Sequence, residues 1–398
     1  MNITIIHRYF WPDNAPYAQM LLQMALALSS EEGNAVSVIS SQPSHSLGGR
    51  LKAKKKETFN NVNILRVSLL PEHGRRIVLR AVNTILFAVQ VFFQLLFRRT
   101  NVVMIASTPP VIMAAVVRWA SKIRKFKYVY HCQDIHPEAM NSVGALNDGY
   151  LYKLLVKIDV KNVNHALRTV VLSQDMKNTL VSRGCDSSNI KIINNFIFEE
   201  NGITNKGTCL DPGTFNILFA GNLGRFQNLE LIVGAAKKLV DIPEINFIFL
   251  GDGVMKNHLQ DEAGDLVDKT VHFNGKVDVG RALEYMAEAD LGLVSIAKGV
   301  VNVAYPSKTM MYLSQGLPLL VLVGKSEMAD FVEVNEVGVV TDTDSPEVLA
   351  ELICELYEKR QELNSKKQII KKLAINIFGA EKVLSDWKGM FKGFEKNV

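Results

Sequence analysis

Residues 215–224, with the sequence FNILFAGNLG, join a continuous apolar run to two closely spaced glycines. An apolar run without polar alternation is typical of a strand that is buried on both faces, as in a parallel sheet. The glycines predict a tight turn, and a segment with helical periodicity follows from about residue 228. The stretch therefore predicts one strand–turn–helix unit of a parallel α/β domain.

The same alternation of strand and helix extends in both directions along the chain. On the C-terminal side, apolar runs such as INFIFLGDG alternate with helix-length segments at 228–240, 280–289 and 307–315. On the N-terminal side, similar runs begin with NITIIHRYF and continue to TVVLSQ. We therefore predict an α/β fold with two Rossmann-like, doubly wound domains that face each other across a cleft, where the carboxyl ends of parallel strands bind ligands.

Changes in composition along the chain suggest the domain boundaries. We expect a first domain at 1–200, a linker rich in Gly, Thr and Asn at 201–214, and a second domain at 215–380. The final segment is helical and rich in lysine, and 381–398 is a candidate to cross back to the first domain. Periodicity alone leaves the placement of this last helix open.

The overall composition excludes several classes of protein. Of the 398 residues, 48% are apolar and 21% are charged, which is typical of a globular chain rather than a disordered one. The net charge of +5 suits anionic ligands or an anionic membrane surface, but it does not indicate a nucleic-acid partner. The four cysteines lie far apart without C-x-x-C spacing, so we expect a reducing compartment and neither a zinc site nor a disulfide framework.

Short motifs at the predicted carboxyl ends of the second sheet's strands suggest an anion site. Gly221 and Gly224 let the backbone approach a phosphate and Arg225 supplies charge, although a plain turn with a surface arginine explains the same residues. The turn at 251–253 either borders a nucleotide or is a generic turn. The Pro-Ser-Lys turn at 306–308 offers the free N–H groups of a helix start together with a lysine. These turns share one predicted sheet edge, so they support one another.

In the first domain, the sequence YHCQDIHPEAM places Asp134, His136 and Glu138 just beyond a buried strand. A carboxylate in that place is a candidate general base that deprotonates an acceptor hydroxyl. The alternative is that Asp134 caps the helix led by Pro137, because Asp is a favourable N-cap residue. The sequence leaves both interpretations open.

Residues 75–99 form an apolar segment with arginines at both ends and no charge from Ala81 to Phe97. The uncharged stretch is marginal for crossing a bilayer. A helix that lies in the headgroup region, with its arginines on anionic lipid, fits better, and a buried core helix is the alternative. The basic run RLKAKKKE at 50–57 is either a second docking element or a solvated loop.

Taken in order, six motifs resemble the retaining glycosyltransferases of family 4, which have the GT-B fold. The motifs are YFWPDNAPYAQML, YHCQDIHPEAM, FAGNLGRFQNLE, GDG, HFNGKV and YPSKTMMYLSQGLPLL. In particular, the chain resembles bacterial enzymes that build surface polysaccharide, such as the L-fucosamine transferase type. The resemblance implies transfer of a sugar from a nucleotide-diphosphate donor in the C-terminal domain to an acceptor in the N-terminal domain.

The resemblance also implies roles for particular residues. It implies that the departing diphosphate is held by Arg225, Lys308 and the amides of a helix start, and that the leaving phosphate itself takes the acceptor proton. Asp134 remains the catalytic candidate that its place after a buried strand suggests. The resemblance implies a nucleotide-sugar donor, with UDP-sugars favoured, and it requires neither a cofactor nor a metal. The residues that it implies in donor binding are Gly221, Asn222, Gly224, Asp252, Gly253, Val277, Pro306, Ser307 and Thr309.

The sequence departs from the family pattern near the donor. Many members carry Arg and Lys on the diphosphate where this chain has Asn222 and Gln227. Many members also carry two glutamates, the second of them linked to the donor ribose, and the alignment places Val303 and Met311 at these positions. The resemblance then implies that Lys308 carries the phosphate charge that the missing residues otherwise supply.

We therefore expect a glycosyltransferase that moves a sugar, such as N-acetyl-L-fucosamine, onto a lipid-linked oligosaccharide in O-antigen or capsule synthesis. Asn14 and Tyr17 are candidates to shape its acceptor site. We expect a peripheral protein on the cytoplasmic face of the inner membrane, without a nucleic-acid partner. The missing glutamates motivate a second hypothesis, a non-catalytic sugar-nucleotide-binding scaffold, and a nucleotide-sugar 2-epimerase is a third. The sequence leaves the donor base, the sugar and the acceptor open.

Overall fold

The structure of this protein is a computed structural model. It describes residues 1–13, 15–43, 53–71, 77–106, 110–142, 144, 146–197, 209–225, 227–297 and 299–394. Several positions named above lie outside the described residues. They are Asn14, residues 50–52 of the basic run, Arg75, Arg76 and residues 201–208 of the expected linker.

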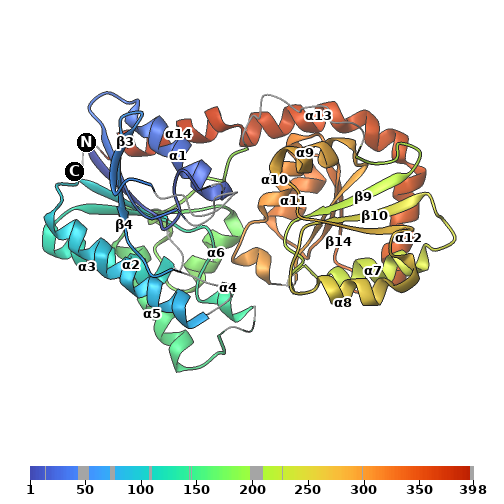
Figure 1. Cartoon of the computed structure of the whole chain (residues 1–398), viewed down its shortest axis with the longest axis horizontal. Helices are drawn as coiled ribbons and strands as arrows, with labels where there is room; N and C mark the ends of the chain where they lie inside the picture. Colours follow the sequence, from blue (N-terminus) through green and yellow to red (C-terminus); the bar gives the residue numbers. More distant parts are fainter. Residues whose placement is uncertain are drawn as a thin grey trace. The chain divides into compact units, whose positions relative to one another are not determined.

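The chain divides into two compact units. One is formed by Met1–Asn194 together with Val383–Val398, and the other by Asn195–Lys382. Each unit contains its own mainly parallel sheet (Figure 1). The predicted α/β fold with two Rossmann-like, doubly wound domains is therefore confirmed.

The sheet of the first unit has the strand order β3-β4-β2-β1-β5-β6-β7-β8. All of its pairs are parallel except β3 with β4 at one edge. Its strands are β1 (Asn2–Ile6), β2 (Ala35–Ser41), β3 (Lys56–Phe59), β4 (Val62–Val67), β5 (Val102–Ile105), β6 (Lys127–His131), β7 (Arg168–Val171) and β8 (Ile190–Ile192). The order reverses direction between β1 and β5, so the switch point of this sheet lies there.

Helices cover both faces of this sheet, which is why its central strands are continuous apolar runs. α1 and α14 lie on one face, and α2, α3 and α5 lie on the other, with α2 packed on α3 and α3 on α5 (Figure 1). The helices are α1 (Pro16–Ser29), α2 (Ile77–Phe97), α3 (Pro110–Arg124), α4 (Glu138–Asn141), α5 (Tyr150–His165), α6 (Gln174–Ser182) and α14 (Ala380–Lys392).

The sheet of the second unit is entirely parallel and has the order β11-β10-β9-β12-β13-β14. From β9 the chain moves outward through β10 and β11, then returns to pair β12 with β9 and continues to the other edge. The strands are β9 (Phe215–Ala220), β10 (Ile245–Leu250), β11 (Val271–Gly275), β12 (Leu291–Ser295), β13 (Leu319–Leu322) and β14 (Gly338–Thr341). The switch point of this sheet therefore lies between β9 and β12.

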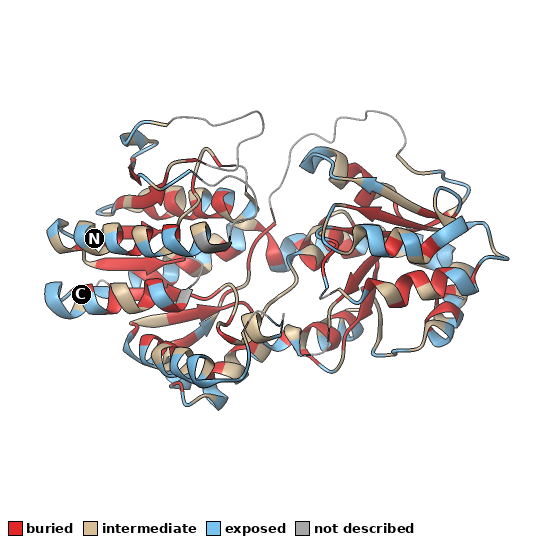
Figure 2. Cartoon of the chain, turned by 60° about the horizontal axis from the view of Figure 1, so that its bottom comes forward, coloured by how far each residue is buried: buried red, intermediate tan, exposed pale blue. Residues whose placement is uncertain are grey.

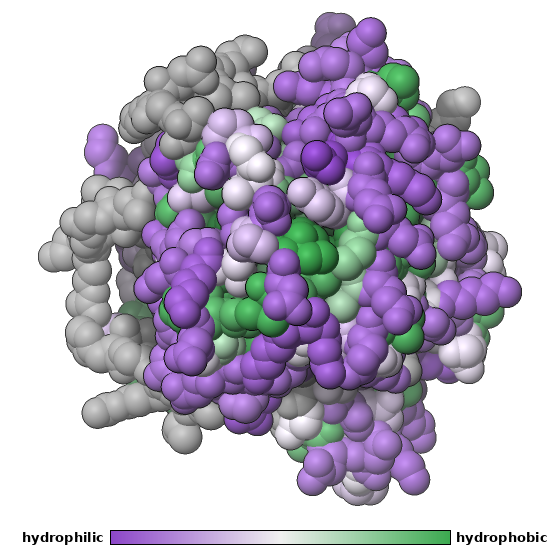
Figure 3. Space-filling view, turned by 90° about the vertical axis from the view of Figure 1, so that its right-hand side faces the viewer, coloured by the Kyte–Doolittle hydropathy of each residue, from purple (hydrophilic) through white to green (hydrophobic). Residues whose placement is uncertain are grey.

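Two apolar clusters, one on each face, form the core of the second unit. One cluster packs the sheet against α9, α10, α11 and α13, and the other packs it against α7, α8 and α12. Figure 2 shows buried strands between helices whose outer sides are exposed, and Figure 3 shows that one outer face of this unit is mostly hydrophilic around a small apolar area. The helices are α7 (Leu229–Lys238), α8 (Lys256–Ala263), α9 (Val279–Glu288), α10 (Ser307–Ser314), α11 (Glu327–Val334), α12 (Pro346–Glu358) and α13 (Arg360–Phe378).

The C-terminal helical region consists of three helices, α12, α13 and α14, separated at Lys359 and Gly379. From Val383 onward, α14 belongs to the first unit. Trp387 is 2% exposed, and its ring lies edge-on to that of His131 with 4.8 Å between the centroids. Lys388 forms an ion pair of 3.0 Å with Glu31 at the end of α1. The last helix therefore completes one face of the first sheet.

Candidate active site

The predicted donor-binding turns of the second unit follow strands that are neighbours in the sheet. The turn at 221–224 follows β9, the turn at 251–253 follows β10, and α10 begins at Ser307 after β12. Because β9 and β12 flank the switch point, the loops that leave their carboxyl ends diverge to opposite sides. The structure therefore brings the three predicted motifs to one edge of one sheet.

The turns after β9 and β10 pack backbone against backbone. The Leu223 N–H donates to the Asp252 carbonyl at 3.0 Å, and the Met255 N–H donates to the Leu223 carbonyl at 3.0 Å. A Cβ atom on Gly251 would lie 1.8 Å from the Gly221 carbonyl oxygen, and one on Gly253 would lie 2.1 Å from that of Leu223. Only glycine permits this approach, which leaves the surface of both turns open to a ligand.

The Lys308 side chain lies against the first of these turns. Its ammonium nitrogen is 3.5 Å from the centroid of the Phe219 ring, a cation–π contact. A Cβ atom on Gly221 would lie 2.7 Å from Cε of Lys308. Burial lowers the pKa of Lys308 to about 7. In the described part of the chain no carboxylate pairs with this ammonium, so the edge presents an uncompensated positive charge.

Tyr312 fixes the position of α10, and with it that of Lys308. The two residues are four apart on the helix and therefore project from the same face. The Tyr312 hydroxyl is fully buried and accepts a hydrogen bond of 2.7 Å from the Ala220 N–H at the end of β9. A Cβ atom on Gly292 would lie 2.8 Å from the Tyr312 ring, so β12 leaves just enough room for it. Tyr312 is not among the residues predicted from the sequence, although its spacing of four residues from Lys308 was a usable signal.

The remaining predicted residues of this edge differ in their exposure and in their hydrogen bonds. Arg225 and Asn222 are exposed, and Gln227 accepts a hydrogen bond of 3.1 Å from the Gly224 N–H, which closes the turn. Asp252 is exposed, and its carboxylate accepts from the Gly253 N–H at 2.9 Å. The glutamine that stands in place of a phosphate-binding lysine thus has a structural partner.

Other predicted residues lie at the start of α10 and beyond β11. Pro306 is the N-cap residue of α10 and no side chain caps the helix, while Ser307 is exposed. Val277 is exposed just beyond β11. Thr309 differs from these residues, because its hydroxyl is buried and donates to the Met328 sulfur at 3.4 Å, and its N–H donates to the Pro306 carbonyl. The Thr309 side chain therefore does not reach the sheet edge where the other predicted residues lie.

Apolar packing surrounds the two positions where many relatives carry glutamates. Val303 is 5% exposed, and Met311 is partly buried against the cluster beneath α10. Neither side chain can hydrogen-bond a ribose hydroxyl. Any such contact at this edge has to come from another group.

In the first unit, Asp134 lies just beyond β6 at the carboxyl edge of the sheet, and burial raises the pKa of its carboxyl group. Pro137 occupies the N-cap position of α4, and no side chain accepts a hydrogen bond from the first turn of this helix. The interpretation of Asp134 as the cap of that helix is therefore wrong. The hypothesis that it is a general base remains.

Two buried histidines lie at the same edge and were missed by the sequence analysis. His131 ends β6, and its ring bonds the Tyr17 hydroxyl at 2.7 Å through Nδ1 and the Gln133 amide at 2.8 Å through Nε2. His7 follows β1, and its ring lies edge-on to Tyr17 with 5.0 Å between the centroids. Burial lowers the pKa of both histidines to about 3, so both are neutral at physiological pH. Tyr17, a predicted acceptor-site residue, is thus held by a neutral polar network.

Among the described residues, no group of three or more His, Cys, Asp or Glu side chains is arranged to hold a metal ion. The described residues do include one helix, Leu79–Phe97, that is long and apolar enough to cross a membrane by length and composition, and 28% of it is buried.

Comparison with known proteins identifies the class of enzyme to which the chain is similar. Residues 214–359, which extend from β9 to the end of α12, match the family model described as "Glycosyl transferases group 1". The chain is a glycosyltransferase. Its match to "Probable glycosyltransferase WbjE" of Pseudomonas aeruginosa is 26% identical over 274 residues, which are 66% of this chain and 67% of that protein.

Two further proteins are similar to this glycosyltransferase. "Putative colanic acid biosynthesis glycosyl transferase WcaI" of Escherichia coli strain K12 is 24% identical over 245 residues, which are 58% of this chain and 60% of that protein. The crystal structure of HepE from Anabaena in complex with UDP has a TM-score of 0.69 at 15% identity and covers 99% of this chain and 100% of HepE. The similarity to the HepE structure shows that the chain has the GT-B fold.

The close approach of the two glycine turns makes a direct prediction. Replacing Gly253 by Ala (Gly253→Ala) places a Cβ atom 2.1 Å from the Leu223 carbonyl oxygen, so the turns must separate. We expect the free energy of unfolding to fall by about 3 kcal/mol, measured by urea denaturation. The control is Gly280→Ala in the first turn of α9, where the nearest atom is 3.4 Å away and the change should stay within about 1 kcal/mol. Equal effects of the two substitutions would contradict the packing described here.

The lowered pKa of Lys308 predicts a pH dependence of stability. The folded pKa is about 7 and the unfolded value is 10.5, so between these values the unfolded state binds more protons and wild-type stability rises with pH. Below pH 7 the ammonium is charged in both states and the folded state bears its full desolvation. Lys308→Met removes this cost, so its advantage over wild type should shrink from about pH 7 to about pH 10. Urea unfolding at several pH values, with Lys237→Met on α7 as control, measures the trend. A difference that is constant across the window disproves it.

Proposed function

We propose that this glycosyltransferase moves a sugar, with retention of configuration, from a nucleoside-diphosphate donor to a lipid-linked saccharide during bacterial surface-polysaccharide synthesis. The observation that carries the proposal is the unpaired Lys308 ammonium at the switch point, beside Gly221 and the open start of α10. The description of WcaI as a putative colanic acid biosynthesis glycosyl transferase and the UDP bound to HepE support this substrate class, and we favour a UDP-sugar. A deoxy-amino sugar such as N-acetyl-L-fucosamine is our proposed cargo.

The departing diphosphate needs positive groups that are already in place before the bond breaks. The N–H groups of Ser307 and Lys308 are free at the start of α10, because a helix leaves its first amides unpaired. The Lys308 ammonium is fixed beside them by Phe219 and Tyr312, and the exposed Arg225 extends from the turn after β9. These groups would hold the charge that leaves the sugar. An anion at this place raises the pKa of Lys308 and keeps it protonated.

The rest of the donor is proposed to lie along the same edge. Gly221, Asn222 and Gly224 would border the diphosphate, and Asp252, Gly253 and Val277 would border the nucleoside. Their common position beyond β9, β10 and β11 supports this arrangement. We leave the side chain of Thr309 out of the site because it is occupied by Met328.

The acceptor is proposed to bind at the carboxyl edge of the first sheet, near Asp134 and Tyr17. A raised pKa makes Asp134 a stronger base than an exposed aspartate, which suits removal of a proton from a sugar hydroxyl. The leaving phosphate is the alternative proton acceptor. The neutral His7 and His131 would orient Tyr17 without adding charge.

The proposed location is the cytoplasmic face of the inner membrane, to which the protein would bind peripherally. α2 supports this placement, because an apolar row on its outer side is exposed although its inner side is buried. A helix that is apolar on both sides is costly to expose to water. A lipid-linked acceptor would be reached from such a surface.

A second candidate function is a sugar-nucleotide-binding scaffold without catalysis. The apolar packing of Val303 and Met311, where many relatives carry acids, favours it. A scaffold would bind nucleoside diphosphates but would not release them from a sugar. A thermal-shift screen with nucleoside diphosphates and their sugars, followed by an assay of diphosphate release, separates the two functions.

The proposed diphosphate site predicts large effects of two substitutions. Lys308→Ala and Arg225→Ala should each lower kcat/KM for the nucleotide-sugar by the equivalent of about 2 to 4 kcal/mol, because each removes charge that stabilises the leaving group. Release of the nucleoside diphosphate measures the rate. Lys237→Ala on α7 is the matched control and should leave the rate unchanged. Unchanged turnover in both site variants would refute the assignment of the diphosphate to this edge.

A further inference from the structure

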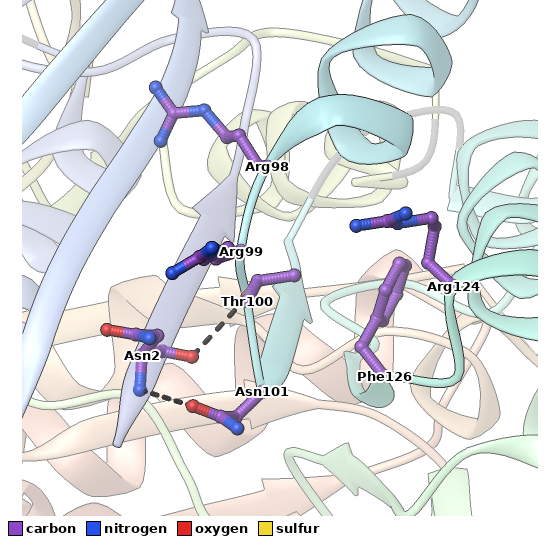
Figure 4. A pocket seen from close by; sticks show the side chains of 7 residues that line it. All are labelled: Asn2, Arg98, Arg99, Thr100, Asn101, Arg124 and Phe126. Atoms are coloured by element: carbon purple, nitrogen blue, oxygen red, sulfur yellow. Dashed lines mark hydrogen bonds between the residues drawn. The ribbon is translucent and has the colours of Figure 1, made fainter.

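A second basic site lies at the opposite edge of the first sheet, where β1, β5 and β6 begin. It is a pocket of about 320 Å³. Its lining residues are Asn2, Arg98, Arg99, Thr100, Asn101, Arg124 and Phe126. Figure 4 shows Arg98 and Arg99 extending on one side of Thr100 and Arg124 lying on its other side. The pocket is separated from Asp134 and Tyr17 by the length of the strands, so it belongs to neither proposed substrate site.

The three arginines of this pocket have no acidic partner. The sequence contains no Asp or Glu from residue 73 to residue 133. In the described ranges none of the three guanidinium groups forms an ion pair, whereas the buried Arg66 and Arg183 are both paired with carboxylates. Arg98 is partly buried, and this burial lowers its pKa. Three like charges gathered without compensation are costly, and an anion would repay that cost.

Asn101 adds a neutral donor to the lining of the pocket. The side-chain carbonyl of Asn101 accepts a hydrogen bond of 2.8 Å from the Asn2 N–H, which turns its NH₂ group the other way (Figure 4). The Thr100 hydroxyl lies 3.2 Å from the Val102 carbonyl of β5 and 3.4 Å from the Asn2 carbonyl of β1, and these contacts hold the segment against both strands. The guanidinium groups that line the pocket offer the kind of donors that bind the oxygens of a phosphate.

Two apolar rows end at these arginines. On α2, Ile85, Val89, Phe93 and Phe97 are spaced by four residues and are 56%, 46%, 53% and 84% exposed. Arg98 follows directly after Phe97. A spacing of four residues places such side chains on one face of a helix.

The neighbouring helix α3 repeats the pattern. Trp119 and Ile123 are 59% and 58% exposed, and Arg124 follows directly after Ile123. α3 packs against α2, so the two rows lie on neighbouring helices. The outer face of the second unit in Figure 3, by contrast, is mostly hydrophilic. An apolar surface that ends in unpaired arginines is complementary to a lipid with an anionic headgroup.

We propose that the pocket formed by Arg98, Arg99 and Arg124 binds the phosphate of an anionic membrane phospholipid, with the exposed rows of α2 and α3 against its acyl chains. The inference rests on the membrane association in the proposed function and names the lipid class and the residues that recognise it. It assigns to these arginines a role separate from the donor and acceptor sites.

Sedimentation of the full chain with vesicles tests the proposal. Wild type should bind vesicles of phosphatidylcholine with phosphatidylglycerol at least about tenfold more tightly than vesicles of phosphatidylcholine alone. The variant R98Q/R99Q/R124Q should lose this preference. The matched control is K122Q/K125Q/K127Q, which removes the same charge from the same region outside the pocket. This control should retain most of the preference for anionic vesicles. Equal losses in both variants would refute a specific pocket and would indicate a general attraction between basic residues and the anionic membrane surface.

Further measurements show which part of the proposal is wrong if the expected result is not found. R124E alone, at an exposed position, replaces the triple variant if that variant does not fold, and it should show the same loss. A second outcome is that inorganic phosphate raises the Tm of wild type but not of the variant, while the two bind vesicles equally. This outcome would overturn the proposal that the ligand is a lipid, and would indicate a soluble phosphate instead. Wild type that binds neither kind of vesicle overturns the membrane association itself. UDP-induced thermal shifts should be equal in all variants, because the donor edge is untouched.

Discussion

Contact between backbone and backbone at the carboxyl ends of β9 and β10 determines the geometry of the proposed donor site. Gly251 and Gly253 lie against carbonyl oxygens of the preceding turn at distances that no Cβ atom allows. Because no side chains separate the two turns, their N–H groups and carbonyls hold each other directly. The surface that results is made of main chain, and its shape does not depend on rotamers. The cation beside it can therefore be positioned with little freedom.

Lys308 occupies a place that is unfavourable for a charge by itself. It gives up hydration to lie against Phe219 and the turn at Gly221, and only the ring compensates it. The Tyr312 hydroxyl, bonded to the end of β9, prevents α10 from moving to relieve the cost. A site that is destabilised in this way gains most from an anionic ligand. The same reasoning applies to Arg98, Arg99 and Arg124, which lie where β1, β5 and β6 of the first sheet begin. In the described part of the chain, none of these three guanidinium groups forms an ion pair.

The alternation of apolar runs and periodic segments was sufficient to predict both sheets and the edge where the glycine turns meet. It was not sufficient for contacts between residues far apart in sequence, such as Tyr312 with Ala220 or Tyr17 with His131, because periodicity carries no information about packing across a sheet. The strand β3 begins inside a basic run, and it pairs antiparallel with β4. The charges of the run hid the strand from a prediction that relies on apolar residues. Thr309 was assigned by its place in a motif, whereas its burial depends on α11, which the motif does not include.

The last helix, α14, gives the first unit a discontinuous sequence, because Val383–Val398 returns to it after the whole of the second unit. A ribosome releases the chain from its N-terminus, so Trp387 is among the last side chains to emerge. Until then the face of the first sheet beside α1 lacks this helix. The first unit is therefore begun at the start of translation and can be completed only at its end.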